Sequence, residues 1–228
     1  MNPPLDLDEL IRVRQSLLSQ GTLRQVLEDM RTVDPSSESD PRFIFLETVQ
    51  FYSNAVNAKE KDAAEWIRLL SEFSMIHTTT PELRFYVTNY QLLCARNAGP
   101  PNDAKVPELY KTAATIAWDL GQQERSEALG HLQYNVARWM HKQGRTGDAL
   151  AHWQSASSHR FHFYGLLKMG KADHEELLAA AQQLAKMHRD FPMYFLDRNI
   201  DECGVAGDVI EELEADFGQE LYAFSAKP

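Results

Sequence analysis

Apolar side chains along this chain recur with the three-to-four-residue spacing of amphipathic helices. One stripe joins Leu10, Val13 and Leu17, and a second begins at Leu23, after Gly21. Residues spaced in this way share one face of an α-helix, and that face must be buried. No stretch alternates apolar and polar residues with the period of two that a half-buried strand shows. The pattern therefore predicts an all-α protein.

Helix-start signals repeat at a fixed interval. Asp40 and Thr80 each place a capping side chain directly before a proline, Pro41 and Pro81, which suits the first helical position. The two signals lie forty residues apart, and the apolar positions that follow them align at the same offset. A fixed period of this size indicates stacked helical units.

Turn signals and apolar stripes together predict five antiparallel helical hairpins and a final acidic helix. Phe161, Phe163 and Tyr164 would then lie where one hairpin connects to the next. Asp208 is expected to cap the last helix, whose apolar stripe would face the array while its acids face water. The hairpins are expected at about residues 6–33, 41–74, 81–120, 124–158 and 160–189, with the acidic cap at 204–224. The stripe of the cap consists of Val209, Ile210, Leu213, Phe217 and Leu221.

The hairpin at residues 131–158 has a distinctive order of small and large residues. A small residue in its first helix permits close approach, a glycine makes the turn, and the second helix then carries small, large and small side chains. The residues in this order are Ala137, Gly144, Ala149, Trp153 and Ala156. This segment resembles a tetratricopeptide repeat, and the Gly21 and Gly170 regions resemble it more weakly. The resemblance implies a right-handed array of antiparallel hairpins, a TPR-like α-solenoid, closed by the C-terminal helix.

In such arrays the first helices of the hairpins line a concave groove suited to peptides. Donors and aromatic side chains there would hold a peptide backbone or an acidic side chain. The alternative is that the same residues form an ordinary solvated helix face. The residues expected to line the groove are Tyr86, Asn89, Arg96, Asn97, His131, Tyr134, Arg138, His141 and Lys142.

Charge is unevenly spread along a chain whose net charge is −10. Lysines and arginines exceed acids by 3 over residues 131–190, which also hold seven of the eight histidines, whereas acids exceed bases by 7 over 191–228. The basic segment predicts a partner with an acidic stretch. Alternatively, the acidic C-terminal helix folds back onto it, as a cap or as an inhibitor. In mild acid, histidines would make the segment more basic.

Composition indicates the cellular compartment of the protein and argues against some classes of partner. The strongly acidic balance argues against nucleic acid as the main ligand. No apolar run reaches the roughly 18 residues of a spanning helix, so no membrane contact is expected. Residues 1–8 lack the features of a signal peptide, and Cys94 and Cys203 fall in apolar helical patterns typical of free buried thiols. These features predict a cytoplasmic protein.

Motifs that would indicate catalysis are missing from the sequence. It contains no phosphate-cradling glycine loop, no nucleophile elbow and no kinase signature. His159 and His162 could share a metal, but no second ligand pair accompanies them. The tryptophans Trp66, Trp118, Trp139 and Trp153 are expected in the core.

We therefore expect no cofactor, no metal and no enzymatic activity. The predicted function is that of an adaptor, scaffold or assembly factor that binds an acidic segment of another protein or peptide. The alternatives are a regulator that responds to a ligand or peptide and, less favoured, an enzyme with a dispersed active site. A homodimer is also possible, because exposed ends of helical arrays can pair.

Overall fold

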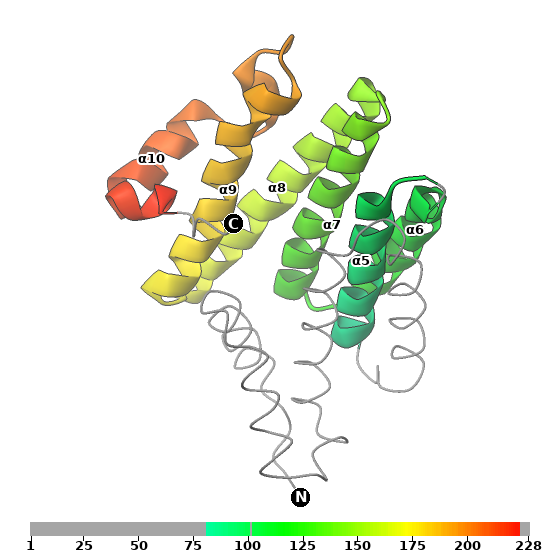
Figure 1. Cartoon of the computed structure of the whole chain (residues 1–228). Coiled ribbons are helices and arrows are strands. Elements are labelled where there is room, and N and C mark those ends of the chain that lie inside the picture. Colours follow the sequence, from blue (N-terminus) through cyan, green and yellow to red (C-terminus); the bar gives the residue numbers. More distant parts are fainter. Residues whose placement is uncertain (1–80, 101, 224–228) are drawn as a thin grey trace, which may run out of the picture. The chain divides into compact units, whose positions relative to one another are not determined.

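The computed structural model describes residues 81–100 and 102–223, and these residues are almost entirely helical (Figure 1). They form six α-helices and three short 3-10 helices, and none of them lies in a strand. The predicted all-α class is therefore confirmed for this part of the chain. The hairpins expected at 6–33 and 41–74, and Trp66, lie outside the described residues.

The helices divide between two compact units, residues 1–112 and 113–228, and α6 spans the boundary. Among the described helices, none is both long enough and apolar enough to cross a membrane. In chain order the elements are α5 (Pro81–Ala98), η2 (Asn102–Lys105), α6 (Val106–Ala117), α7 (Gln122–Lys142), α8 (Thr146–Gly170), α9 (His174–Tyr194), η3 (Ile200–Cys203), α10 (Gly207–Phe217) and η4 (Gly218–Tyr222).

In the first unit, α5 begins at Pro81, as its capping signal predicted. The helix is buried on nearly every side, with Phe85 and Tyr90 almost fully enclosed. Its side chains include the free thiol of Cys94, which is buried as expected. Burial raises the pKa of this thiol to about 12, so it stays protonated at neutral pH.

In the second unit, α7 and α8 form the hairpin that the small and large residues predicted. Gly144 makes the turn with a φ of 71°, a conformation that favours glycine. Ala137 of α7 and Ala149 and Ala156 of α8 are buried, and Trp153 of α8 fills the space beside them. The hairpin itself is confirmed, whereas the wider repeat architecture stays a prediction.

One predicted connection is wrong, because α8 is continuous through residues 158–160. No glycine or proline interrupts residues 148–164. Within the helix, the hydroxyl of Ser157 donates to the carbonyl of Trp153 one turn earlier, and it also donates to the carbonyl of Cys203 in η3. The helix ends only at Gly170, followed by Lys171 with a φ of 57°. Asp173 then caps α9 in a reciprocal capping box with Glu176. The expected hairpin 160–189 is therefore the end of one long helix followed by α9.

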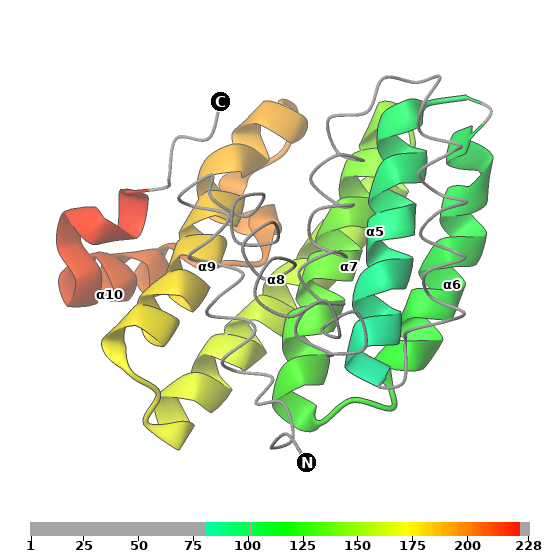
Figure 2. The same cartoon turned by 60° about the horizontal axis from the view of Figure 1, so that its bottom comes forward.

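Helices α7, α8, α9 and α10 follow one another in space within this unit, as both views show (Figure 2). Trp153 is enclosed at the centre, in ring contact with Phe191, Tyr194 and Phe195 at the end of α9. Trp139 is buried as expected, but Trp118 follows the end of α6 and is 66% exposed, so its predicted core role is wrong.

The last helix also keeps its predicted apolar stripe. Ile210 and Leu213 of α10 are buried, and Val209 and Phe217 are partly buried against the same core. The predicted single helix 204–224 is shorter, because α10 ends at Phe217 and the buried Leu221 belongs to η4. Its cap differs from the prediction, because Ala206 holds the N-cap position and Asp208 lies in the first turn. The acidic residue there still suits the positive end of the helix dipole.

Candidate functional site

Three of the predicted groove residues share one face of α7 and meet neighbouring helices. Tyr134 is buried, with its ring 5.2 Å from that of Trp153 in α8. His141, two turns further along, packs edge-on against Tyr194 at 5.3 Å and Phe195 at 6.0 Å. This face of α7 is therefore set against both α8 and the end of α9.

Arg138 lies between these two positions on α7 and is held by aromatic rings. Its guanidinium carbon is 5.7 Å from the centre of the Tyr134 ring and 5.9 Å from that of Tyr194. Such cation–π contacts contribute about 0.5–2 kcal/mol, depending on desolvation. Arg138 makes no hydrogen bond or ion pair with any residue that the structure describes. Its donors are positioned but unused within the described chain.

Arg160 lies in the middle of α8 and is only 5% exposed. Its Nη1 donates a hydrogen bond to the carbonyl of Gln183 at 3.2 Å, and its guanidinium carbon is 4.6 Å from the Tyr134 ring. Its Nε has no acceptor among residues 81–100 and 102–223. Burial lowers the pKa of Arg160 to about 10, which still leaves the side chain charged at neutral pH.

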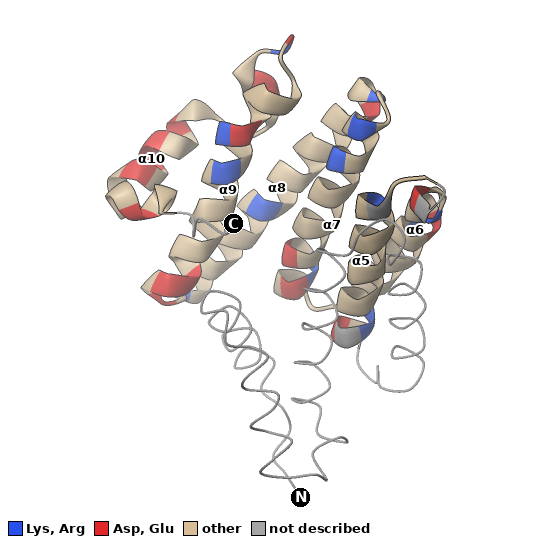
Figure 3. Cartoon of the chain, viewed as in Figure 1, with Lys and Arg blue, Asp and Glu red and all other residues tan. Residues whose placement is uncertain are grey.

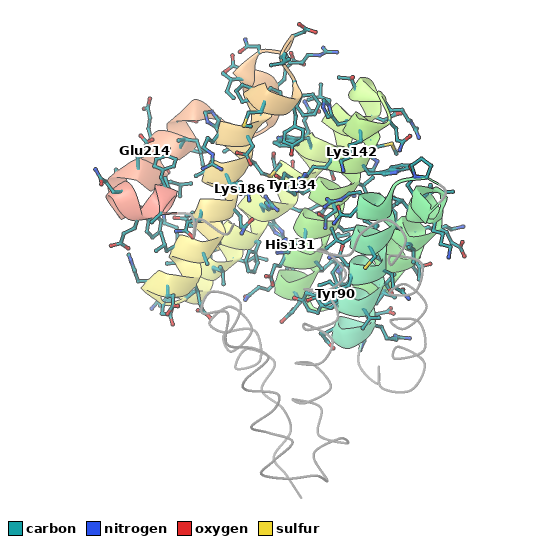
Figure 4. The ribbon with its side chains drawn as sticks, viewed as in Figure 1. Tyr90, His131, Tyr134, Lys142, Lys186 and Glu214 are labelled. Atoms are coloured by element: carbon teal, nitrogen blue, oxygen red, sulfur yellow. The ribbon has the colours of Figure 1, made fainter. Side chains whose placement is uncertain are left out.

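Lys186 approaches from α9 and completes the group of cations. Figure 4 shows Lys186 and Tyr134 between the ribbons of α9 and α7, in front of α8. Burial lowers the pKa of Lys186, the nearby Asp190 raises it, and Arg138, Arg160 and Arg189 lower it further. We call Tyr134, Arg138, Arg160, Lys186 and Tyr194 the basic–aromatic cluster.

Asp190, which lies near the cluster, is already paired with its neighbour Arg189. Both Nε and Nη2 of its neighbour Arg189 donate to its carboxylate, at 3.0 and 2.9 Å. The pair Arg189–Asp190 is therefore close to neutral. Among the described residues, Arg138, Arg160 and Lys186 therefore remain as three cations of the cluster that no acid offsets through a bond.

The remaining predicted groove residues lie elsewhere. His131 is half-buried on α7, 3.7 Å from the carboxylate of Glu127, and Lys142 is exposed at the end of the same helix (Figure 4).

The other four belong to the first unit. Tyr86, Asn89 and Arg96 of α5 are buried, and Asn97 accepts hydrogen bonds from Arg96. Their burial gives no support to an open binding face on α5. That they share a groove with the α7 residues stays a prediction.

The acidic C-terminal segment packs against α9 through α10 and η4. An ion pair joins Lys168 to Glu212 at 2.9 Å, and Nε2 of His174 lies 3.2 Å from the carboxylate of Glu220. Gln182 also donates to the carbonyl of Glu220 at 2.8 Å. Acidic residues colour α10, whereas α7, α8 and α9 carry lysines and arginines, with acids also at the starts of α7 and α9 (Figure 3). These contacts favour the cap over the alternative in which the segment occupies the basic site.

The histidines of α8 have ordinary packing and hydrogen-bonding roles. Nδ1 of His162 lies 2.8 Å from the hydroxyl of Ser126, and burial, followed by the charge of His162, lowers the pKa of His159. Within the described part of the chain, no group of three or more histidines, cysteines and acids is arranged to hold a metal ion.

Sequence reasoning missed three members of the cluster: Arg160, Lys186 and Tyr194. The excess of three bases over residues 131–190 was a signal for them, but it did not say which bases converge. Arg160 looks like a solvated helix residue in the sequence, and its burial depends on how α7 and α9 pack against α8.

No protein-family model matches this chain, and neither a curated protein nor a solved structure matches it. The tetratricopeptide resemblance therefore stays a prediction from residues 131–158. Function must be inferred from the chemistry of the basic–aromatic cluster.

Proposed function

We propose that this chain is an adaptor or assembly factor that binds an acidic segment of a partner protein at the basic–aromatic cluster. The observation that carries this proposal is the environment of Arg160. The side chain is buried and charged, yet its protein acceptor is one backbone carbonyl. Buried charges in proteins are normally paired, because an isolated charge is costly to remove from water.

A carboxylate is the natural partner for such a group. The guanidinium presents its donors in a planar fork that matches two carboxylate oxygens, and these charge-assisted bonds are about twice as strong as neutral ones. Arg138 and Lys186 are half-buried whereas Arg160 is buried, so an acidic side chain would meet the two half-buried cations first. The Tyr134 and Tyr194 rings supply rigid apolar surface beside the charges, as in many binding hot spots.

The two free thiols support a reducing compartment for this activity. Cys94 and Cys203 are both buried and unpaired with each other. We propose the cytoplasm as the site of action, since exported proteins more often use cysteines in disulfides.

A photo-crosslinking amino acid at Lys142 tests the binding proposal. Lys142 is exposed one residue beyond His141, so a bound segment at the cluster would come within reach. In a lysate of the source cells, we expect crosslinks to peptides rich in acidic residues. The double variant Arg138→Glu/Lys186→Glu should lose these crosslinks, because it reverses the charge of the cluster.

The matched control changes the same net charge elsewhere. Lys105 and Arg145 are exposed, and neither belongs to the cluster, so Lys105→Glu/Arg145→Glu should retain the crosslinks. Crosslinked peptides without net negative charge would contradict the proposal. So would equal crosslinking by the two double variants.

A further inference from the structure

The basic–aromatic cluster has more positive charge than one carboxylate can balance. Arg138, Arg160 and Lys186 contribute three cations, whereas Asp190 is already bonded to Arg189. Burial is the main cause that lowers the pKa of Lys186; Asp190 opposes this shift, and the charges of Arg138 and Arg160 add to it. The like charges of the three side chains therefore repel one another. A carboxylate would bring a single negative charge and leave most of this repulsion in place.

Two of the cations also gather around one aromatic ring. The guanidinium carbons of Arg138 and Arg160 lie 5.7 and 4.6 Å from the centre of the same Tyr134 ring. A run of several acidic side chains would distribute its charges over neighbouring backbone positions. A compact site with several cations instead suits one group that carries more than one charge.

Unused donors at the cluster indicate several acceptor oxygens in that group. Arg160 keeps Nε without an acceptor, and Arg138 and Lys186 donate no hydrogen bond, among the residues that the structure describes. A phosphomonoester carries a charge of about −1.5 to −2 at pH 7 and three strong acceptor oxygens. Two guanidinium forks and one ammonium group match this combination of charge and acceptors.

We propose that the cluster binds a phosphorylated side chain, a phosphoserine or phosphothreonine within the acidic segment of the partner. This inference rests on the proposed function and specifies the group that is bound. Arg160 is the inner cation, and Arg138 and Lys186 are the outer ones. Binding involves no covalent change, and partner phosphorylation would regulate the interaction.

Three matched peptide libraries test this proposal. Each has the same randomised acidic flanks, and the central residue is phosphoserine, aspartate or serine. Equilibrium binding to the intact chain should be at least about tenfold tighter for phosphoserine than for aspartate, because the phosphate makes more charge-assisted bonds. Serine should be weakest. Inorganic phosphate is titrated in parallel to separate a protein-borne phosphate from a free one.

Two variants assign the binding to the cluster. Lys186→Gln and Arg138→Gln remove half-buried cations and should reduce the preference for phosphoserine over aspartate by about tenfold each, the effect of one strong charged contact. Arg198→Gln removes an exposed arginine whose partner is Glu202 and should leave the preference unchanged. Neither variant depends on replacing the buried Arg160, whose loss would also affect packing.

The outcomes separate the two proposals. Equal affinity for phosphoserine and aspartate, with loss of both in the variants, would overturn phosphate recognition but keep the binding of acidic segments. Failure of all three libraries to bind would overturn both. Binding of inorganic phosphate as tight as that of the phosphoserine library would also overturn the inference, because the ligand would then be a free anion.

Discussion

The basic–aromatic cluster and the acidic C-terminal segment are the two charged regions of the second unit, and they differ in whether their charges have partners within the chain. The acids of α10 and η4 have partners within the chain, such as Lys168 for Glu212 and His174 for Glu220. The cations of the cluster have rings for neighbours, and Arg138 and Arg160 have no acid bound to them within the described residues. Helix α9 contributes to both regions.

This difference teaches that a charge run in a sequence has more than one possible fate. The acidic segment is anchored by the buried apolar residues Ile210 and Leu213, so its charged side chains mainly form its solvent-exposed face. The cluster combines burial with unpaired charge, which costs stability unless a ligand compensates for it. We therefore infer that the acidic segment has a structural role and that the basic–aromatic cluster binds a ligand.

The largest expected effect comes from removing the aromatic support of the cluster. Trp153 is almost fully buried and contacts Tyr134, Tyr194 and Phe195. Trp153→Ala should lower the free energy of unfolding by about 3–5 kcal/mol, as expected for a large core cavity. Urea denaturation followed by circular dichroism measures it.

The matched control for this substitution is Trp118→Ala. Trp118 is 66% exposed and stacks on Arg125 at 4.9 Å, a contact that contributes about 0.5–1 kcal/mol at exposed sites. Equal losses of stability in the two variants would contradict the central place of Trp153 in the core.

The next effect concerns the anchoring of the acidic segment. Leu213 is 1% exposed against the core, so Leu213→Ala should cost about 2–5 kcal/mol. Leu196 is 84% exposed, and Leu196→Ala should change stability by no more than about 0.5 kcal/mol. Limited proteolysis should cut the C-terminal segment faster in Leu213→Ala only. A segment that stays protected in this variant would show that apolar packing does not anchor it.

Mild acid should destabilise the second unit. Burial is the main cause that lowers the pKa of His152, His159 and His188 below the ordinary value of 6.5. The unfolded chain therefore binds protons more readily, and stability present above pH 6.5 is lost as the pH falls through the folded pKa values. The melting temperature should drop between pH 7.5 and 5, and less so in a triple His→Gln variant. An equal drop in both proteins would contradict this assignment. The sequence predicted that histidines make this segment more basic in mild acid. For these three residues, that gain of charge requires a lower pH than for an ordinary histidine.

Replacing two glycines by alanine should have smaller effects, which differ because only one of the two sites has room for a side chain. A Cβ at Gly130 would lie 2.9 Å from Cγ of Arg160, whereas a Cβ at Gly165 would meet nothing within 4 Å. Gly165→Ala should stabilise α8 by up to about 1 kcal/mol through helix propensity. Gly130→Ala should lack this gain and weaken binding of acidic peptides, because Arg160 must move. Identical behaviour of the two variants in denaturation and binding would contradict the close contact.

The smallest expected effect comes from the exposed ion pair that joins α8 to α10. Lys168 and Glu212 are 2.9 Å apart and both largely exposed, and such pairs contribute about 0–1 kcal/mol. A double-mutant cycle with Lys168→Gln and Glu212→Gln measures the coupling. A coupling well above 1 kcal/mol would mean that charge, and not apolar packing, holds the acidic segment in place.

Much of the helical structure could be predicted, because it follows from local signals. Pro81 marks the start of α5, and Gly144 marks the turn between α7 and α8. The small and large residues of that hairpin predicted its packing. The false connection at 158–160 arose because a repeat pattern was extended over a stretch in which Phe161 and its neighbours already fit a continuous helix.

The site was only partly predictable. Tyr134, Arg138 and His141 share one helix face, so sequence spacing alone grouped them correctly. Arg160 and Lys186 join them through the packing of α8 and α9, which one sequence without relatives does not specify. The net charge of 131–190 indicated a basic region, but burial of Arg160 is a tertiary property.

The central claim is that Arg138 and Arg160 are held ready for an acidic ligand, and arginine-resolved NMR tests it most directly. The Nε–H signals of the intact chain would be followed while a peptide with four consecutive glutamates is added. We predict that the signals of Arg138 and Arg160 shift together and saturate, whereas those of Arg145 and Arg198, paired with Asp148 and Glu202, stay in place. A matched glutamine peptide should shift none of them. Equal shifts at all four arginines, or no shift at Arg138 and Arg160, would contradict the account.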